Sequence, residues 1–252
     1  MRFRSLSLAG AFVLSLALPL AAAAQQLTVS AAASLTDAFK ELAPKFEAAH
    51  QGATVRFNFA ASGVLLQQIT QGAPVDVFAS ADQETLDKAA NQKLIDTATR
   101  RNFASNSLVL IEPAKDGPNL HSLQDLTGAA VQRIAIGKVE TVPVGRYTQQ
   151  ALESAKLWEP LRPRFVQADS VRQVLDYVSR GEVDAGFVYR TDAAIMGDKV
   201  KIVLTATGHT PVTYPVAVVA DSRQKALAQE FVSFLASEPA QQVLAKYGFG
   251  KP

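Results

Sequence analysis

Junctions at which a strand pattern passes directly into a helix pattern restrict the fold of this chain more than any other feature of its sequence. Between residues 27 and 90 such a junction occurs three times, with apolar strands expected at 27–30, 55–59 and 75–79 and a helix after each. Consecutive units of this kind form parallel strands, because a crossover helix brings the chain back to the same end of the sheet. The sequence therefore predicts an α/β fold with helices on the faces of a parallel sheet.

The first junction, at residues 31–37, has the sequence Ala-Ala-Ala-Ser-Leu-Thr-Asp. The helical spacing of apolar residues begins after Ser34, so we interpret Ser34 as the N-cap and Asp37 as the acid of a short capping box. Unpaired N–H groups and the positive end of the helix dipole make a helix start suitable for an anion. A single junction of this kind is usually only a capped helix, but a similar one recurs at Ser62, where a strand again ends in small residues.

A second group of strands follows the first three. Residues 91–106 are polar and show no clear periodicity, and further strands are expected at 107–111, 133–137, 165–167, 184–188, 200–204 and 216–219. Asp82 is expected to cap the helix that follows the third strand, and the pair Asp169-Ser170 is expected to cap a helix of the second group. The last two helices, at 224–236 and 239–247, belong to a C-terminal tail that is too short to be a domain.

We expect this tail to pack on the first group of strands, so that the chain crosses twice between two lobes. Lobe 1 would comprise residues 25–106 and 214–252, and lobe 2 would comprise residues 107–213. Each lobe would be a mostly parallel sheet flanked by helices, and the two crossings would act as hinges. Ligands of open parallel sheets bind beyond the C-terminal ends of the strands, which here would face the cleft between the lobes.

Residues 1–24 have the pattern of a secretory signal peptide, because Arg2 and Arg4 precede an apolar run and small residues precede Gln25. We expect this segment to be removed and the protein to be periplasmic. The sequence contains no cysteine, which excludes disulfides and a lipid-modified cysteine. The full chain has 25 Lys and Arg residues against 23 Asp and Glu, so loss of the two arginines leaves a balanced charge. No basic run is present, and nucleic acid is not an expected partner.

Four of the strand-to-helix junctions offer unpaired N–H groups: those at Ser34, at Ser62, at 142–145 and at 170–171. Neither serine turn contains a charged residue, and Gly63 would allow a ligand to approach the backbone closely. Neutral donors and helix dipoles suit a fully ionised oxyanion, because donors alone satisfy its oxygens. A ligand that carries an acidic proton would also need an acceptor, which is usually an Asp or Glu side chain.

Six motifs occur in order along the chain: Ala-Ala-Ala-Ser-Leu-Thr at 31–36, Phe-Ala-Ala-Ser-Gly at 59–63, Gly-Ala-Pro-Val-Asp-Val-Phe-Ala-Ser-Ala-Asp at 72–82, Val-Pro-Val-Gly at 142–145, Asp-Ala-Gly-Phe-Val-Tyr at 184–189 and Tyr-Pro-Val-Ala-Val-Val at 214–219. In these motifs the chain resembles the periplasmic molybdate-binding proteins of ABC importers, and the similarity covers essentially the whole chain after residue 24. The resemblance implies the two-lobed, class II periplasmic binding protein fold, with the ligand in the interlobe cleft.

The resemblance also implies which residues bind the oxyanion. Ser34 and Ser62 would donate hydroxyl and backbone N–H groups from lobe 1, Val144 and Val171 would donate backbone N–H groups from lobe 2, and Tyr189 would donate its phenolic O–H. The ligand would be molybdate or tungstate, so that the metal is bound only as part of the oxyanion. No cofactor, catalytic residue or direct metal ligand is expected. The expected partner is the membrane permease of an ABC importer, and the protein is expected to be a monomer.

Three charged residues near these motifs have structural interpretations. Asp76, between two valines, would alternate toward solvent or hold a neighbouring loop rather than bind a metal. Arg146 and Arg172 lie close to the expected N–H donors and could raise the local potential. Arginines at helix starts are usually surface residues, and this is our interpretation of both.

Other functions remain open at the sequence level. Sulfate or another tetrahedral oxyanion is the nearest alternative, since sulfate matches molybdate in charge and shape and differs only in size. A secreted serine-type enzyme is a remote alternative: His50, His121 and His209 are far in sequence from the serine turns, and no nucleophile-elbow motif is present. The effector domain of a transcription regulator can share this fold, but the signal peptide pattern and the missing helix-turn-helix count against it.

Overall fold

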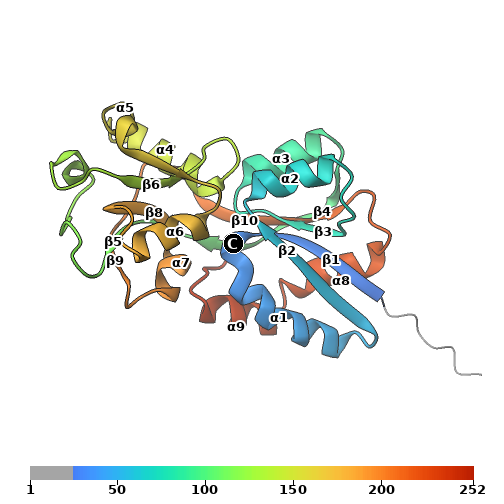
Figure 1. Ribbon diagram of the computed structural model, residues 1–252. Coiled ribbons are helices and arrows are strands. Elements are labelled where there is room, and N and C mark those ends of the chain that lie inside the picture. Colours follow the sequence, from blue (N-terminus) through green and yellow to red (C-terminus); the bar gives the residue numbers. More distant parts are fainter. Residues whose placement is uncertain (1–24) are drawn as a thin grey trace, which may run out of the picture.

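The computed structural model describes residues 25–252 and contains two five-stranded sheets, each with helices packed on it (Figure 1). The expected signal peptide lies outside the described residues. The first sheet contains β1 (Gln25–Ala32), β2 (Ala53–Ala60), β3 (Val77–Ala79), β4 (Ile95–Asn106) and β10 (Val212–Val219), in the order β2-β1-β3-β10-β4. The second contains β5 (Leu108–Pro113), β6 (Ile134–Gly137), β7 (Phe165–Ala168), β8 (Ala185–Tyr189) and β9 (Val200–Thr205), in the order β7-β6-β8-β5-β9.

The two sheets have the same topology. In each, four strands run in one direction and one strand, β10 or β5, runs in the opposite direction between two neighbours. The reversed strand is in both cases the one that enters from the other sheet: β5 follows β4 after Ser107, and β10 follows β9 after residues 206–211. The predicted α/β fold with two mostly parallel sheets and two crossings is therefore confirmed.

Helices cover both faces of each sheet. On the first sheet, α2 (Ser62–Thr70) and α3 (Gln83–Asn91) lie on one face, and α1 (Thr36–Ala49), α8 (Lys225–Phe234) and α9 (Glu238–Lys246) lie on the other (Figure 1). The second sheet carries α4 (Pro143–Ser154), α5 (Trp158–Leu161), α6 (Val171–Ser179) and α7 (Arg190–Ile195). Three short 3-10 helices complete the described elements: η1 (Ala33–Leu35), η2 (Gln124–Thr127) and η3 (Arg162–Arg164). None of the helices within residues 25–252 has the length and apolar character needed to cross a membrane.

A cluster of buried and half-buried phenylalanines fixes α1 and the C-terminal tail to the first sheet. The ring centroid of Phe39 on α1 lies 5.8 Å from that of Phe57 on β2 and 5.8 Å from that of Phe103 on β4. Phe231 on α8 packs edge-on against Phe39 and against Phe46, with centroid distances of 6.1 and 5.1 Å. Such aromatic pairs add to the stabilisation from burial of their apolar area. This packing explains why apolar residues recur at helical spacing in α1: they lie on the side of the helix that faces the sheet and α8.

The structure confirms two of the expected helix caps and contradicts a third. The side chain of Asp82 accepts from the backbone N–H of Thr85 at the start of α3, and Ser170 caps α6 in the same way. Ser34 is not an N-cap, because a 3-10 turn begins at Ala33 before α1 and the serine side chain caps neither helix. Asp37 likewise forms no capping box.

Besides the short helix α5, two elements were not expected from the sequence. Residues 91–106, which lack a clear periodicity, contain the long edge strand β4, from Ile95 to Asn106. The short helix α7 directly follows β8 and begins at Arg190, in a segment for which no helix was expected. Both elements lie beside the crossings between the sheets, since β4 leads into the first crossing and α7 contacts β5 and β9.

Candidate functional site

A small cavity lies between the elements of the two sheets. The segments of the first sheet contribute Ala32, Ala33, Ser34, Ala61, Ser62 and Ala81, and those of the second contribute Val142, Pro143, Val144, Val171 and Tyr189. All five residues expected to bind the oxyanion are among them. The structure therefore brings these residues together from five separate elements, and their role in binding stays a prediction.

All five residues lie where a strand gives way to a helix, because Tyr189 is the last residue of β8 and directly precedes α7. Ser34 is in η1 after β1, Ser62 is the first residue of α2 after β2, and Val144 and Val171 are in the first turns of α4 and α6. The first-turn N–H groups of a helix have no acceptor within the helix, and the positive end of the helix dipole adds to their attraction for an anion. These helix starts converge on the cavity from both sheets, which is an arrangement suited to a small anion.

Three hydroxyl groups line the cavity, and they differ in their hydrogen-bond partners. The Ser62 Oγ accepts from the backbone N–H of Ala81 at 3.0 Å, and the Ser34 Oγ lies 3.0 Å from the Tyr214 Oη. The Tyr189 Oη is fully buried and has no hydrogen-bond partner among residues 25–252. Burial raises the pKa of the Tyr189 phenol well above its ordinary value, so this group keeps its proton and remains a donor.

No charged side chain within the described part of the chain lines the cavity, but two arginines lie just outside it. Arg146 on α4 pairs with Asp82 at the start of α3 and donates to the Thr85 Oγ1 at 2.8 Å. Its side chain is only 10% exposed, so the interpretation of Arg146 as a surface residue was wrong. Each of these contacts joins a helix of the second sheet to a helix of the first.

Arg172 on α6 makes the second connection of this kind. It donates to Asp37 on α1 at 2.8 Å and to the buried Asp192 on α7 at 2.6 Å. Its side chain is 24% exposed, so it is half-buried rather than on the surface. Burial raises the pKa of Asp192 to about 6 even though the neighbouring guanidinium lowers it. Arg172 thus links three helices beside the cavity.

Gly63 has a different role from the one expected from the sequence. Its backbone N–H donates to the Thr141 carbonyl oxygen at 2.9 Å, from the start of α2 to the loop before α4. A Cβ atom at residue 63 would lie 2.6 Å from that oxygen and 2.7 Å from the Thr141 Cα, closer than atoms can pack. The absent side chain therefore allows the two sides of the cavity to approach each other, rather than a ligand to approach the backbone.

The side chains behind Ser34 were missed by the sequence analysis. Tyr214 is fully buried on β10, and the Asn106 Nδ2 at the end of β4 donates to the Tyr214 Oη at 3.2 Å. Tyr214 stands in one of the recognised motifs, but only as the first residue of an apolar strand. The sequence does place a tyrosine and an asparagine at the two predicted crossings. Because polar groups that are buried need hydrogen-bond partners, their positions could have indicated a hydrogen bond between them.

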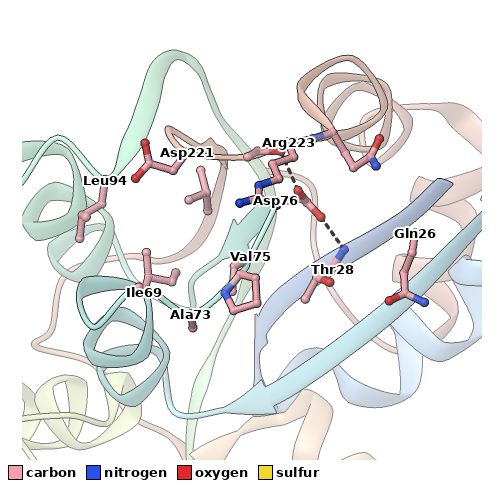
Figure 2. Close-up of a pocket in the computed structure, with 14 residues that line it drawn as sticks. Gln26, Thr28, Ile69, Ala73, Val75, Asp76, Leu94, Asp221 and Arg223 are labelled. Atoms are coloured by element: carbon pink, nitrogen blue, oxygen red, sulfur yellow. Dashed lines mark hydrogen bonds between the residues drawn. The ribbon is translucent and has the colours of Figure 1, made fainter.

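The remaining candidate residues lie away from this cavity. Asp76 accepts from the Thr28 N–H at 2.8 Å and from the Ser222 hydroxyl at 2.7 Å, which confirms that it holds a neighbouring loop. It borders a larger pocket at the opposite end of β1, where Figure 2 shows it between Thr28 and the segment carrying Asp221 and Arg223. Within residues 25–252, none of the histidines lines the cavity, and no group of three His, Asp or Glu side chains could hold a metal ion.

Comparison with known proteins shows the family and the fold of the chain. Residues 27–250 match the model of a family described as bacterial extracellular solute-binding protein. The chain is 38% identical over 229 residues to the molybdate-binding protein ModA of Escherichia coli strain K12, which covers 89% of this chain and 88% of that protein. It is 39% identical over 225 residues to YvgL of Bacillus subtilis strain 168, which carries the name of an ABC transporter substrate-binding lipoprotein, with 88% and 85% covered. The solved structure of the Azotobacter vinelandii periplasmic molybdate-binding protein superposes with a TM-score of 0.77 at 28% identity, covering 90% of this chain and 99% of that one.

Proposed function

The chain belongs to the bacterial extracellular solute-binding protein family, and from that premise we propose that it captures molybdate or tungstate and delivers it to an ABC importer. The names of the relatives support the ligand and the transporter class, since ModA of E. coli is a molybdate-binding protein and YvgL bears an ABC transporter name. Delivery implies a membrane permease as partner. Binding and release involve no covalent change in the ligand, so the protein acts as a carrier rather than an enzyme.

The observation that carries this proposal is the Tyr189 hydroxyl, which has no partner among residues 25–252 and borders a cavity that those residues line with uncharged hydroxyl and apolar side chains. A buried polar group without a partner is rare in native proteins, because leaving it unsatisfied costs free energy. A bound oxygen acceptor would satisfy the Tyr189 O–H. A fully ionised oxyanion offers such acceptors on every side, and the convergent helix starts and the two serine hydroxyls would satisfy its other oxygens.

The absence of a carboxylate from the cavity lining, within residues 25–252, favours a ligand that has no proton to donate. A protonated phosphate would need an acceptor among these groups, and none of the lining side chains is a dedicated acceptor. Sulfate would fit the same logic but is smaller than molybdate. Its shorter bonds would leave some donors without an oxygen, and each such lost hydrogen bond costs about 1–3 kcal/mol. We infer that the cavity selects among dianions by size.

We propose that residues 25–106 with 214–252 form one lobe and residues 107–213 the other, and that the crossings allow the lobes to open and close. The ligand would bind to the helix starts of one lobe, and closure would bring the donors of the other lobe onto its remaining oxygens. Closure also excludes water, which strengthens every donor contact to the dianion. The permease would then recognise the closed form. A monomer in the periplasm suffices for this cycle, because all five binding residues lie in one chain.

Isothermal titration of the chain from residue 25 onward, freed of anions, would test this proposal. We expect one-to-one binding of molybdate and of tungstate, with much weaker heat from sulfate and none from phosphate. Binding of sulfate as tight as that of molybdate would keep the oxyanion site but overturn the size-selection argument. No heat from any of the four anions would overturn the proposed function.

A further inference from the structure

Tyr214 lies behind Ser34 on the strand that returns to the first sheet and takes part in a chain of hydrogen bonds that leads to the cavity. The Asn106 Nδ2 donates to the Tyr214 Oη at 3.2 Å, and the Tyr214 Oη lies 3.0 Å from the Ser34 Oγ. Asn106 ends β4 and Tyr214 is on β10, so the chain begins where the two crossings between the sheets lie side by side. All three groups belong to segments that border the proposed hinge or the proposed site.

The orientation of the Asn106 amide is fixed by its other contacts. Its Oδ1 accepts from the backbone N–H of Ser107 at 2.9 Å, so its Nδ2 is the atom that faces Tyr214. The same nitrogen also donates to the Thr191 Oγ1 at 2.9 Å. An amide nitrogen can only donate, and its two hydrogens are used in these two bonds. The Tyr214 oxygen is therefore an acceptor from Asn106.

This acceptor role determines the direction of the rest of the chain. The phenol of Tyr214 is fully buried, and burial raises its pKa, so it keeps its hydrogen. The Ser34 Oγ is the acceptor available to that hydrogen, whereas a bond in the reverse direction would leave the hydrogen unsatisfied. Tyr214 donates to Ser34, and the hydrogen of the Ser34 hydroxyl is left for the cavity. Hydrogen bonds in series also polarise one another, which makes the last O–H a stronger donor.

We propose that Tyr214 is a positioning residue that holds the Ser34 hydroxyl as a donor to the bound oxyanion and thereby helps to reject anions that carry a proton. This inference rests on the proposed function. With its oxygen occupied by Tyr214, Ser34 presents its hydrogen to the ligand and is a poor acceptor for a ligand proton. The Ser62 hydroxyl is arranged in the same way, because its oxygen already accepts from the Ala81 N–H.

A double-mutant cycle tests whether Tyr214 acts through Ser34. The four proteins are the unaltered chain, Tyr214→Phe, Ser34→Ala and the double variant, and each is titrated with molybdate. We expect Tyr214→Phe alone to weaken binding about tenfold, which corresponds to about 1.4 kcal/mol. In the Ser34→Ala background the same substitution should have little further effect, because the hydroxyl that it positions is absent. Tyr247→Phe is the matched control, since Tyr247 donates to Glu41 away from the cavity.

Competition with phosphate gives a readout that a purely structural role would not change. Freed from Tyr214, the Ser34 oxygen can accept from a protonated anion, so phosphate should compete better against molybdate in Tyr214→Phe than in Tyr247→Phe. If Tyr214→Phe does not fold, Asn106→Asp serves instead, because a carboxylate there would accept the Tyr214 hydrogen and reverse the chain. The negative charge that Asn106→Asp adds weakens anion binding whether or not Ser34 is present. The loss of affinity that results from reversing the hydrogen-bond chain requires the Ser34 hydroxyl, so it disappears in the Ser34→Ala background.

The outcomes separate this inference from the proposed function. If the unaltered chain does not bind molybdate, the proposed function fails first. If the unaltered chain binds but Tyr214→Phe binds equally well, the positioning role is overturned while the proposed function stands. Equal losses from Tyr214→Phe in both backgrounds, with a lowered unfolding temperature in the absence of ligand, would also overturn it, because they would show a structural contribution that does not pass through Ser34.

Discussion

At the scale of single residues, the polar side chains that line the cavity are buried, uncharged hydroxyl groups. Tyr189, Ser34 and Ser62 are each no more than 3% exposed, and an isolated buried hydroxyl destabilises a fold unless it finds a partner. Ser34 and Ser62 have protein partners for their oxygens, but the Tyr189 Oη has none among the described residues. We therefore expect binding and stability to respond in opposite directions when this group is removed.

The variant Tyr189→Phe tests this expectation. It should weaken molybdate binding by about 1.5–3 kcal/mol, the range for a hydrogen bond to a charged group, which is about tenfold to a hundredfold in Kd. The unfolding temperature without ligand should stay the same or rise slightly, because an unsatisfied buried hydroxyl has been removed. Titration calorimetry and thermal unfolding measure the two effects. Unchanged affinity would remove Tyr189 from the binding site.

Asp192 should make stability depend on pH in a defined direction. Burial raises the pKa of this carboxyl from 3.8 to about 6, so the folded state binds its proton more tightly than the unfolded state does. The stabilising contribution of the group is therefore complete below about pH 4 and is lost as the pH rises through 6. We expect the free energy of unfolding of the unaltered chain, relative to that of Asp192→Asn, to fall between pH 4 and 7. Urea unfolding at several pH values measures this, and a difference that does not vary with pH would contradict it.

At the scale of the elements, the site consists of helix starts at the ends of strands. A helix start that follows a strand recurs after β1, β2, β6 and β7, and it brings four of the expected binding residues to the cavity. Ser170 caps α6 by accepting from the Gln173 N–H at 3.2 Å, and Val171 is the next residue. The cap satisfies the Gln173 N–H in the first turn, and the Val171 N–H remains the donor that we propose for the anion.

Loss of this cap should affect stability more than binding. Ser170→Ala is expected to lower the free energy of unfolding by about 1 kcal/mol, the usual cost of an N-cap. Affinity for molybdate should fall by less than the effect of Tyr189→Phe, because the α6 backbone keeps its position through buried Val174 and Val178. Ser237→Ala removes the equivalent cap of α9, away from the cavity, and is the matched control. A much larger loss of affinity for Ser170→Ala than for Ser237→Ala would show that the cap itself positions a donor.

The sequence predicted those parts of the fold that local pattern determines. Apolar runs and helical spacing located most strands and helices, and Asp82 and Ser170 were recognised as caps. The strand β4 was missed because its pairing with β10 contains register shifts, so its buried residues, such as Ile95, Thr99 and Phe103, do not alternate with a period of two. Ser34 was misread as a cap because a 3-10 turn, which the sequence pattern does not distinguish from a helix, precedes α1.

The candidate site was predictable only where a residue belongs to a strand-to-helix junction or to a recognised motif. Val144 and Val171 would be ordinary core residues by periodicity alone, and it was the family resemblance that singled them out. Contacts between distant segments were not predictable. Arg146 reaches Asp82 across 64 positions and Tyr214 reaches Ser34 across 180, and no local pattern encodes such pairs.

At the scale of the whole molecule, several contacts join the elements of the two sheets around the cavity, and three of them bear on closure. Arg146 pairs with Asp82, Arg172 pairs with Asp37, and the Gly63 N–H donates to the Thr141 carbonyl oxygen at 2.9 Å. The ion pairs involve long side chains that can adjust to small displacements. The contact at Gly63 is between two backbones, so it depends directly on how closely the two sides approach.

Substitution of Gly63 should therefore weaken molybdate binding, which requires closure of the lobes, without destabilising the fold. In Gly63→Ala the new Cβ would lie 2.6 Å from the Thr141 oxygen, and this backbone atom cannot move aside as a flexible side chain would. We expect a loss of about 1–3 kcal/mol in molybdate binding, typical of overpacking at a close contact, or about fivefold to 150-fold in Kd. Alanine is a better helix former than glycine, so stability without ligand should be unchanged or higher.

Because Gly63→Ala should weaken binding without lowering stability, comparing the two quantities tests whether binding requires closure of the lobes. Gly197→Ala is the matched control, because its Cβ would meet the nearest atom, the Ala194 oxygen, at an ordinary 3.6 Å. Titration with molybdate and thermal unfolding without ligand on both variants compare binding with stability. Weaker binding and undiminished stability in Gly63→Ala alone would show that the ligand is held by an approach of the two lobes that residue 63 must permit. Equal affinity in the two variants would show that the bound form does not require this contact, and the lobes would then close less tightly around the anion than the Gly63–Thr141 hydrogen bond implies.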